Sequence, residues 1–481
     1  MGRSYRRLVI IYRSFMDSDH FLKPFFEPRS VAIVGANPRT GDFAFNAIEN
    51  LENFGYKGHI YPVNRKYAEI LGRQCYTTVK DIPFHVELAV VVSPRNTVPG
   101  VIRRCGEKGI KSVVVPGQGF ADADDEGKKL QQDIINLAKY YGIRILGPNT
   151  LGVLNPFANF TTSFLLLIDI HTLPIGMISQ SGVFFTTVGR YSCFGKAIDV
   201  GNACDIDVAD ALEYFIQDED VSVILLHIEG IIDGNRFRTA VTKATKAKPI
   251  ICLKTGRSQE AAKAASSHTG SLIGSDYVWD ALCKQTGIIR ANSIDELSDL
   301  GKAFHYLPRP KGNRVAILSG SGGVGIIGID VCIEHGLYPT KFAQSTKEHL
   351  KTIAPHWYEP KNPLDLWPFM MSSPKTATKA IESILNTVLN DENVDAVLFF
   401  GGTWWDDLIP SFVEIIVETT NQFPNKPIAI SFSGGAILDV LAEHISERLE
   451  KAGKGFVFSN PNDAAKALAK LVDYSEFLSQ S

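Results

Sequence analysis

Short apolar runs that alternate with helix-like segments constrain the fold of this chain more than any other feature. From residue 30 onward the apolar runs are SVAIVGA, HIYPV, ELAVVVS, KSVVVPG and IRILG. Between the last two, apolar residues recur at three- and four-residue steps and predict one buried helix face: Leu130, Ile134, Leu137, Ala138 and Tyr141. Strands that alternate with helices in this way predict a parallel sheet covered by helices.

The same pattern starts again twice. After GPNTLGVLNP (residues 147–156) come the runs PIGMIS, AIDVG, VSVILLHIE and KPIICLK, and after the linker LPRPKGN (307–313) come RVAILSG, VDAVLFFGG, KPIAISF and GFVFS. A chain of 481 residues also exceeds the size at which one core stops growing, roughly 250–300 residues. We therefore predict an α/β fold with three consecutive Rossmann or flavodoxin-like domains. The predicted limits are 1–24 for an N-terminal extension, then 25–155, 156–306 and 307–481.

The composition excludes several classes of function. The 49 basic and 52 acidic side chains nearly balance, which argues against a nucleic-acid or membrane-surface partner. Seven scattered cysteines without a C-x-x-C pair predict neither disulfides nor a zinc site, so we expect a cytoplasmic protein. The first sixteen residues are basic and acid-free like a transit peptide, but their apolar run LVII is too short for a signal or a membrane span. An alternative is that translation starts at Met16.

Open parallel sheets bind ligands where their strands end, and glycine-rich segments follow two of the predicted strands. GANPRTG (35–41) is either a phosphate-binding loop or a plain strand-to-helix turn. The G-x-G-x-x-G spacing occurs instead at Gly320, Gly322 and Gly325, which alone would suggest NAD. The expected acidic residue about 20 positions later is missing from LYPTKFAQST (337–346), so a phosphate loop or a close-packing loop fits equally well.

Polar residues follow two strands of the second domain. ISQSGVFF (178–185) places hydroxyl groups where a strand ends and a helix begins, which fits an anion site or an ordinary serine cap. A serine-hydrolase turn is excluded because G-x-S-x-G is absent. Glu229 ends the apolar run VSVILLHI, so it either caps a neighbouring backbone group or acts on a ligand. His227 is expected to be a packed core histidine.

His268 lies in AASSHTGSLIGSD (264–276). Since no two of the eleven histidines have the H-x-x-x-H or H-E-x-x-H spacing, we predict no metal site. The neighbours of His268 are small and polar, as in a loop that moves or wraps a phosphate: Ser266, Ser267, Thr269, Gly270 and Ser271. Imidazole, with a pKa of about 6.5, is largely neutral at pH 7 and can attack phosphorus without first losing a proton.

Several long motifs occur together in one order: GAN, IYPVNRKYAEILG, GPNTLGVLNP, SQSG, VGNACDIDVADALEYF, IEGIIDGNRF, LKTGRS, SSHTGSLIGSD and NPLDL. In this respect residues 25–475 resemble the α subunit of NDP-forming acyl-CoA synthetases, the ADP-forming acetyl-CoA synthetase group related to succinyl-CoA synthetase. The resemblance implies a CoA-binding first domain and two flavodoxin-like ligase domains. It implies that His268 carries a transient phosphate, that Glu229 bonds to the other ring nitrogen, and that Ser181, Gly182 and the Val183 backbone hold the phosphate. The implied CoA-binding residues are Gly35, Ala36, Asn37, Arg39, Asn64, Lys66, Ser93, Pro94 and Asn149.

The resemblance implies the reversible reaction of acyl-CoA, ADP and phosphate to a carboxylic acid, CoA and ATP, through an acyl phosphate and a phosphohistidine. The family's ATP-grasp domains have no counterpart in this sequence. A separate ATP-grasp β subunit that binds ADP or ATP and Mg²⁺ is therefore implied, in an α2β2 assembly. Which small carboxylic acid is used, and whether ADP or GDP, stays open.

The chain departs from the family pattern near the implied CoA and phosphate sites. Asp42 and Ala44 stand where the family usually has lysine and glycine, and Arg39 or Lys66 is the alternative cation. Thr150 follows GPN in place of the usual cysteine, while Val183 and Phe184 are larger than the residues that usually follow SQSG. A CoA-binding regulatory or scaffold protein without turnover is the alternative function. Retention of both His268 and Glu229 favours the enzyme.

Overall fold

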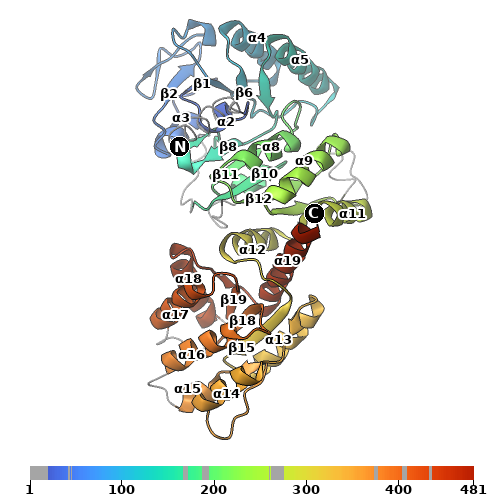
Figure 1. The fold of residues 1–481 in the computed structure, drawn as a ribbon. Helices are drawn as coiled ribbons and strands as arrows, with labels where there is room; N and C mark the ends of the chain where they lie inside the picture. The colour runs from blue at the N-terminus through green and yellow to red at the C-terminus, as the bar shows by residue number, and fades with distance from the viewer. Residues whose placement is uncertain are drawn as a thin grey trace, which may run out of the picture. The chain divides into compact units, whose positions relative to one another are not determined.

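The computed structural model describes residues 20–41, 44, 46–165, 172–186, 194–258, 260–261, 276–372, 377–402, 409–432 and 436–480. The chain divides into two compact units, one of residues 1–248 and 252–286 and one of residues 249–251 and 287–481 (Figure 1). The described strands form three main sheets and one short two-stranded sheet. The predicted class, α/β with several parallel-sheet domains, is confirmed.

The first sheet has the order β2-β1-β5-β6-β7, and every neighbouring pair is parallel. Its strands are the first five predicted apolar runs: β1 (Ser30–Val34), β2 (His59–Val63), β5 (Leu88–Val91), β6 (Ser112–Val114) and β7 (Arg144–Leu146). Three main helices accompany it: α3 (Ala47–Asn53), α4 (Val98–Lys108) and α5 (Asp125–Tyr141). Shorter elements are α2 (Lys23–Phe26), β3 (Glu69–Ile70), β4 (Arg73–Gln74), and the 3-10 turns Val79–Asp81 and Arg95–Thr97.

Helix α5 shows how the sequence sets the ends of these helices. The Asp124 side chain accepts a hydrogen bond from the Gly127 N–H, and two further acidic residues occupy the first turn, where negative charge is favoured. Gly142, with φ of +63°, ends the helix. The predicted apolar face is present, since Ile134 and Ala138 pack in one core with Val113 of β6.

The second sheet surrounds β10 (Ile175–Ser179), which pairs in parallel with β11 (Lys196–Asp199) on one side and β12 (Val223–Ile228) on the other. Strand β13 (Ile250–Lys254) follows β12 in the sheet. Beyond β11 lie two antiparallel strands, β8 (Gly152–Asn155) and β9 (Phe160–Thr161). The accompanying helices are α6 (Val183–Thr186), α8 (Val208–Gln217), α9 (Gly234–Ala247) and α11 (Asp276–Thr286), with a 3-10 turn at Pro156–Ala158.

The third sheet belongs to the second unit and has the order β16-β15-β18-β19-β20, again with parallel pairs. Its strands are β15 (Arg314–Ser319), β16 (Tyr338–Pro339), β18 (Ala396–Gly401), β19 (Ile428–Phe432) and β20 (Val457–Phe458), with β17 (Leu364–Asp365) beside β15. The other elements of this unit are β14 (Ile289–Ala291), α12 (Ile294–Tyr306), α13 (Gly322–Glu334), α14 (Gln344–Ile353), α15 (Trp367–Ser372), α16 (Ala377–Asn390), α17 (Ile409–Gln422), α18 (Ala436–Lys451) and α19 (Pro461–Gln480).

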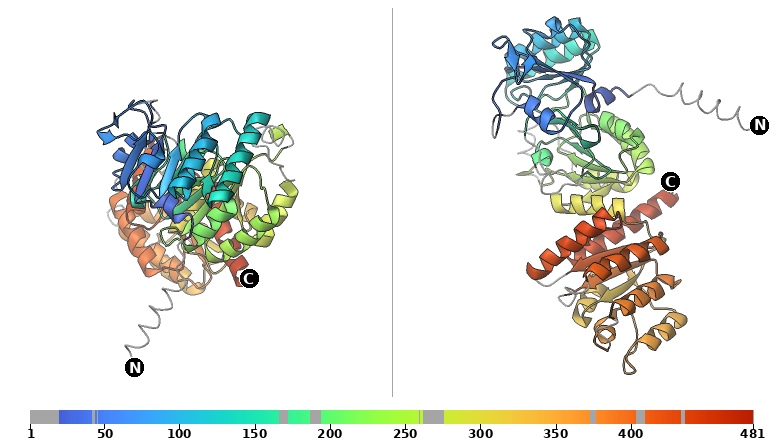
Figure 2. Two further views of the ribbon diagram at one scale, coloured as in Figure 1. Left: turned by 90° about the horizontal axis from the view of Figure 1, so that it is seen from above. Right: turned by 90° about the vertical axis from the view of Figure 1, so that its left-hand side faces the viewer.

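Both faces of the third sheet are buried. Leu318, Val397 and Phe399 share a core with residues of α14 to α18. On the opposite face Gly328 of α13 packs so closely that a Cβ there would lie 2.6 Å from the Phe400 ring. Helices cover the sheet in the views of Figure 2. Burial on both faces explains why these strands are continuous apolar runs instead of alternating ones.

Apart from the antiparallel strands β8 and β9, and β17 beside β15, the three sheets share one strand order. In each, the first of the remaining strands lies between the second and the third: β1 between β2 and β5, β10 between β11 and β12, and β15 between β16 and β18. The loops after the first and third strands therefore meet at the carboxyl edge, where open α/β sheets bind ligands.

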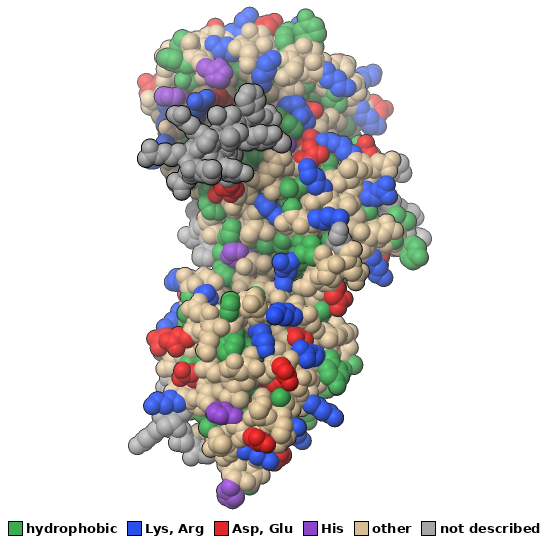
Figure 3. All heavy atoms as spheres, in the orientation of Figure 1, with side chains coloured by type: hydrophobic (Ala, Val, Ile, Leu, Met, Phe, Trp, Pro, Cys, Tyr) green, Lys and Arg blue, Asp and Glu red, His purple; other side chains and the backbone are tan. Residues whose placement is uncertain are grey.

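The surface and the helices give two further facts. On the face drawn in Figure 3, Lys and Arg side chains are interspersed with Asp and Glu. Among the described residues, no helix combines the length and the apolar character that a membrane span requires.

Buried Lys196 leads to a first prediction. Its side chain is 1% exposed, and its Nζ lies 2.7 Å from Asp218 Oδ2 and 2.9 Å from Asp220 Oδ2. K196M would leave the buried Asp218 carboxylate without its cation, so we expect the free energy of unfolding to fall by about 3 kcal/mol in urea titrations. D220N is the control, because the Asp220 side chain is 48% exposed and its loss should cost less than about 1 kcal/mol. Equal losses of unfolding free energy in K196M and D220N would contradict the role of Lys196 as the cation for buried Asp218.

Buried Asp199 leads to a second prediction. Its Oδ2 accepts the Leu151 N–H at 2.7 Å and its Oδ1 accepts the Gly201 N–H at 3.1 Å. Burial raises the pKa of Asp199 to about 6, and the charge of Glu229 acts in the same direction. The folded protein therefore holds this proton more tightly than the unfolded chain, and stability that is present below about pH 4 is lost as the pH rises through the folded pKa of about 6.

Asparagine does not titrate, so D199N removes this pH dependence. We expect the unfolding free energy of D199N, relative to wild type, to increase by about 3 kcal/mol between pH 4 and pH 7, because one pKa unit corresponds to about 1.4 kcal/mol. Urea unfolding of D199N and wild type at both pH values measures this change. The loss of a carboxylate oxygen as hydrogen-bond acceptor costs the same at both pH values, so it cancels from the comparison. A difference that does not change with pH would refute the raised pKa.

Candidate active site

The segment SQSG follows β10 as predicted, and α6 begins at Val183. Two serines shape the turn between them. The Ser179 hydroxyl donates to the Ser181 carbonyl oxygen at 2.7 Å and accepts the Ser181 N–H at 2.9 Å. The Val183 N–H approaches Ser181 Oγ at 3.5 Å. The serines therefore fix the backbone that leads into the helix.

Gln180, between the two serines, reaches the end of the neighbouring strand β12. Its Oε1 accepts the N–H groups of Glu229 at 2.7 Å and Gly230 at 3.1 Å, and its Nε2 donates to the Gly230 carbonyl oxygen at 2.8 Å. The structure thus brings two of the predicted site segments, SQSG and IEG, together. The sequence patterns did not single out Gln180, although its place inside the SQSG motif was a signal.

Gly182 lies against a third segment. A Cβ on Gly182 would come 2.9 Å from Leu151 Cδ1 and 3.7 Å from Asp199 Oδ2. Thr150, next to Leu151, donates its hydroxyl hydrogen bond to the Asp199 carbonyl oxygen. The Glu229 charge is close enough to contribute to the raised pKa of Asp199. The carboxyl groups of Asp199 and Glu229 therefore both lie near the carboxyl edge of the second sheet. The sequence motifs identified only Glu229.

His227 is a core residue, as expected. Its ring is 4.6 Å from that of Phe184, between centroids, and the residue is 2% exposed. The two ring nitrogens lie 3.4 Å from Ser179 Oγ and from Thr255 Oγ1. Burial lowers the pKa of His227 to about 4, which keeps the ring neutral at pH 7.

His268 itself lies outside the described residues, which end at 261 and resume at Asp276. The described chain before it leaves β13 beside the site, because the Thr255 N–H donates to the Ile228 carbonyl oxygen at 3.0 Å. Thr255, the residue after β13, therefore lies beside Ile228, the residue before Glu229.

The residues predicted to bind CoA all follow strand ends of the first sheet. Gly35, Ala36, Asn37 and Arg39 follow β1, Asn64 and Lys66 follow β2, Ser93 and Pro94 follow β5, and Asn149 follows β7. Gly35 has φ of +88°, and a Cβ there would lie 1.9 Å from the Val92 carbonyl oxygen. Only glycine fits this approach between the β1 and β5 loops.

Two asparagines hold the loop after β1. Asn64 Nδ2 donates to the Ala36 carbonyl oxygen at 2.7 Å, and its Oδ1 accepts the Lys66 N–H at 2.9 Å. Asn46, which the sequence patterns did not single out, donates to the carbonyl oxygens of Asn37 and Arg39 and caps α3. Its position directly before a helix was the available signal. Asp42 lies outside the described residues.

The loop after β15 repeats the serine turn. The Ser319 hydroxyl donates to the Ser321 carbonyl oxygen at 2.8 Å and accepts the Ser321 N–H at 3.2 Å. A Cβ on Gly325 would lie 3.2 Å from Pro363, so this glycine serves close packing. The structure therefore provides a packing reason for part of the G-x-G-x-x-G spacing.

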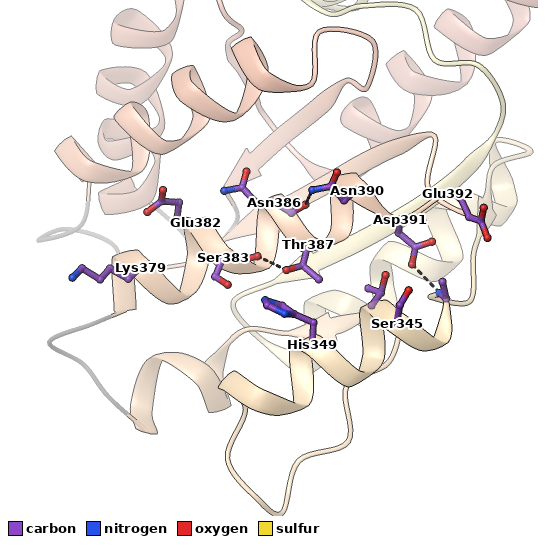
Figure 4. Close-up of a pocket in the computed structure, with 12 residues that line it drawn as sticks. Ser345, His349, Lys379, Glu382, Ser383, Asn386, Thr387, Asn390, Asp391 and Glu392 are labelled. Carbon is purple, nitrogen blue, oxygen red and sulfur yellow. Dashed lines mark hydrogen bonds between the residues drawn. The ribbon is translucent and has the colours of Figure 1, made fainter.

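A groove of about 960 Å³ lies elsewhere, between α14 and α16 of the second unit (Figure 4). His349 projects from α14 and Lys379 and Glu382 from α16. None of the predicted site residues that the structure describes lines this groove.

Two protein families match the chain. The "CoA binding domain" family matches residues 29–156, and the "succinyl-CoA ligase like flavodoxin domain" family matches residues 173–304. Both matches agree with the positions of the first two sheets.

The chain is also similar to named proteins along nearly its whole length. Acetate–CoA ligase (ADP-forming) I subunit α of Pyrococcus furiosus is 37% identical over 95% of this chain and 98% of its own, and the II subunit α is 35% identical over 94% and 97%. A longer acetate–CoA ligase (ADP-forming) II of Archaeoglobus fulgidus is 36% identical over 96% of this chain and 68% of its own.

A solved structure gives the same result. It is the dinucleotide-forming acetyl-coenzyme A synthetase 1 of Ca. Korarchaeum cryptofilum in complex with phosphate and ADP. The TM-score is 0.84 at 29% identity, over 95% of this chain and 97% of that one. The chain thus belongs to the ADP-forming acetate–CoA ligase family and corresponds to the α subunit of these enzymes.

Proposed function

We propose that this chain is the α subunit of an NDP-forming acyl-CoA synthetase. The enzyme reversibly converts acyl-CoA, ADP and phosphate into a carboxylic acid, CoA and ATP, in the cytoplasm. One observation carries the proposal. In a chain that matches α subunits over 97% and 98% of their length, SQSG, IEG and Thr255, the residue after β13, meet at one sheet edge.

The residues take the following roles in this proposal. Phosphate attacks the acyl-CoA carbonyl carbon and displaces CoA, and the acyl phosphate then transfers its phosphoryl group to the imidazole of His268. The backbone at Ser181, Gly182 and Val183 holds the phosphate. Glu229 accepts a hydrogen bond from the second ring nitrogen and stabilises the cationic ring that forms with the phosphorus–nitrogen bond. Support comes from the hydrogen bonds that join Glu229 to this turn through Gln180.

CoA binds the first domain in this proposal, at the loops after β1, β2, β5 and β7. The match of residues 29–156 to a CoA-binding family supports this site. So does the strand order, because the loops after β1 and β5 flank the point where it reverses. Arg39 and Lys66 supply cations for the CoA phosphates, and both side chains are exposed.

An ATP-grasp β subunit completes the enzyme in an α2β2 assembly, and it binds Mg²⁺ and ADP or ATP. The relatives named as α subunits support a partner chain. A longer relative, the acetate–CoA ligase of Methanocaldococcus jannaschii, also supports it, because this chain covers 64% of its length. The phosphoryl group then passes from His268 to ADP in a second in-line transfer.

Labelling of the αβ complex tests the role of His268. With Mg²⁺ and ATP labelled at the γ-phosphate, wild type should form an acid-labile, base-stable phosphoprotein, because phosphohistidine has this stability. H268A should abolish the label. H349A, which removes an exposed histidine of the second unit, should retain it. Label that persists in H268A would refute the assignment.

Binding of CoA to the full chain tests the first site. N64A removes the bonds that hold the β1 and β2 loops together, so we expect the Kd for CoA to rise about tenfold in calorimetry, which is about 1.4 kcal/mol. Phosphorylation of His268 from ATP does not require CoA and should stay at the wild-type rate. An unchanged Kd for CoA, or a phosphorylation rate that falls as much as the CoA affinity, would contradict this site.

A further inference from the structure

Gln180 makes three hydrogen bonds to the backbone of two consecutive residues. Its Oε1 accepts from the Glu229 and Gly230 N–H groups, and its Nε2 donates back to the Gly230 carbonyl oxygen, all within 3.1 Å. The side chain touches the turn after β12 through both its donor and its acceptor. This arrangement needs an amide and cannot be made by a hydrocarbon of the same length.

The amide acts where the β10–β12 ladder ends. This ladder runs from Ile175↔Val223 to Ile178↔Leu226, and no further pair of it occurs among the described residues. A carboxamide has the donor and acceptor of a peptide group, so Gln180 replaces the missing backbone pairing at the point where Glu229 begins.

Gln180 binds a segment that contains a glycine. Gly230 has no side chain to restrict its backbone, and glycine is the residue with the most accessible conformations. The charge of Glu229 also acts on the nearby Asp199 carboxyl group, and like charges repel. Bonds to the Glu229 backbone resist this repulsion and hold the main chain from which the Glu229 carboxylate projects.

We propose that Gln180 is the positioning residue of the phosphoryl-transfer site: its carboxamide fixes the main chain of Glu229 and so directs the Glu229 carboxylate to the imidazole of His268. The inference rests on the proposed function of Glu229. Gln180 contacts neither the imidazole nor the phosphate in this scheme, and it acts only through Glu229.

A double-mutant cycle in the αβ complex tests the proposal. Q180M keeps the length of the side chain and removes all three bonds, and the rate of phosphohistidine formation from labelled ATP and Mg²⁺ is measured by rapid quench. We expect Q180M to slow this step by about 100-fold, the cost of misplacing a catalytic group by about 1 Å. In the E229Q background Q180M should change the rate by less than about twofold, since residues that act through one another are not additive.

Two further variants separate positioning from general damage. N50L removes a buried amide in the same unit, where Asn50 Nδ2 donates to the carbonyl oxygens of Ser163 and Leu165 at 2.7 Å each. It should lower the melting temperature without slowing phosphorylation. Q180L also removes all three bonds without adding a charge, and it serves as the second variant if Q180M does not fold.

The outcomes are distinguishable. Equal slowing by Q180M in the wild-type and E229Q backgrounds would overturn the positioning role and leave the function of Glu229 intact. So would an N50L rate as low as that of Q180M. A wild-type rate in E229Q would instead refute the proposed function of Glu229, and the positioning role with it.

Discussion

The order of the parallel strands is the constraint on which the proposed sites depend. In each of the three sheets the first main parallel strand lies between the second and third, so the loops after the first and third of these strands meet at the carboxyl edge. In the first sheet this contact is the approach of Gly35 to Val92. In the second it is the bonding of Gln180 to Glu229, and in the third the Gly320 N–H donates to the Phe400 carbonyl oxygen at 2.9 Å.

Side-chain amides hold the loops at these edges. Asn64 and Asn46 bind the backbone of the loop after β1, and Gln180 binds the turn after β12. In the third sheet Asn362 accepts the Ile317 N–H and donates to the carbonyl oxygens of Val315 and Thr340. An uncharged amide satisfies backbone groups without adding a charge to a site meant for anions.

The sequence predicted those features that depend on local patterns. The apolar runs gave the parallel strands, and the SQSG and IEG motifs gave two segments that the structure places together. Gln180 and Asp199 were missed because their importance comes from residues about 50 positions away, which no local pattern encodes. The antiparallel strands β8 and β9 were missed for a related reason: β8 lies in a segment that proline and glycine marked as a break, and its partner is β11. The position of His268 stays a prediction.

The tight approach of Gly35 to Val92 has a consequence for how such proteins diversify. Packing fixes the backbone at this point, but Pro38, Arg39 and Thr40, a few residues further, are exposed. Charge can be exchanged along this rim without disturbing the sheet beneath it. The electrostatic environment of the rim can therefore change while the architecture that carries it stays the same.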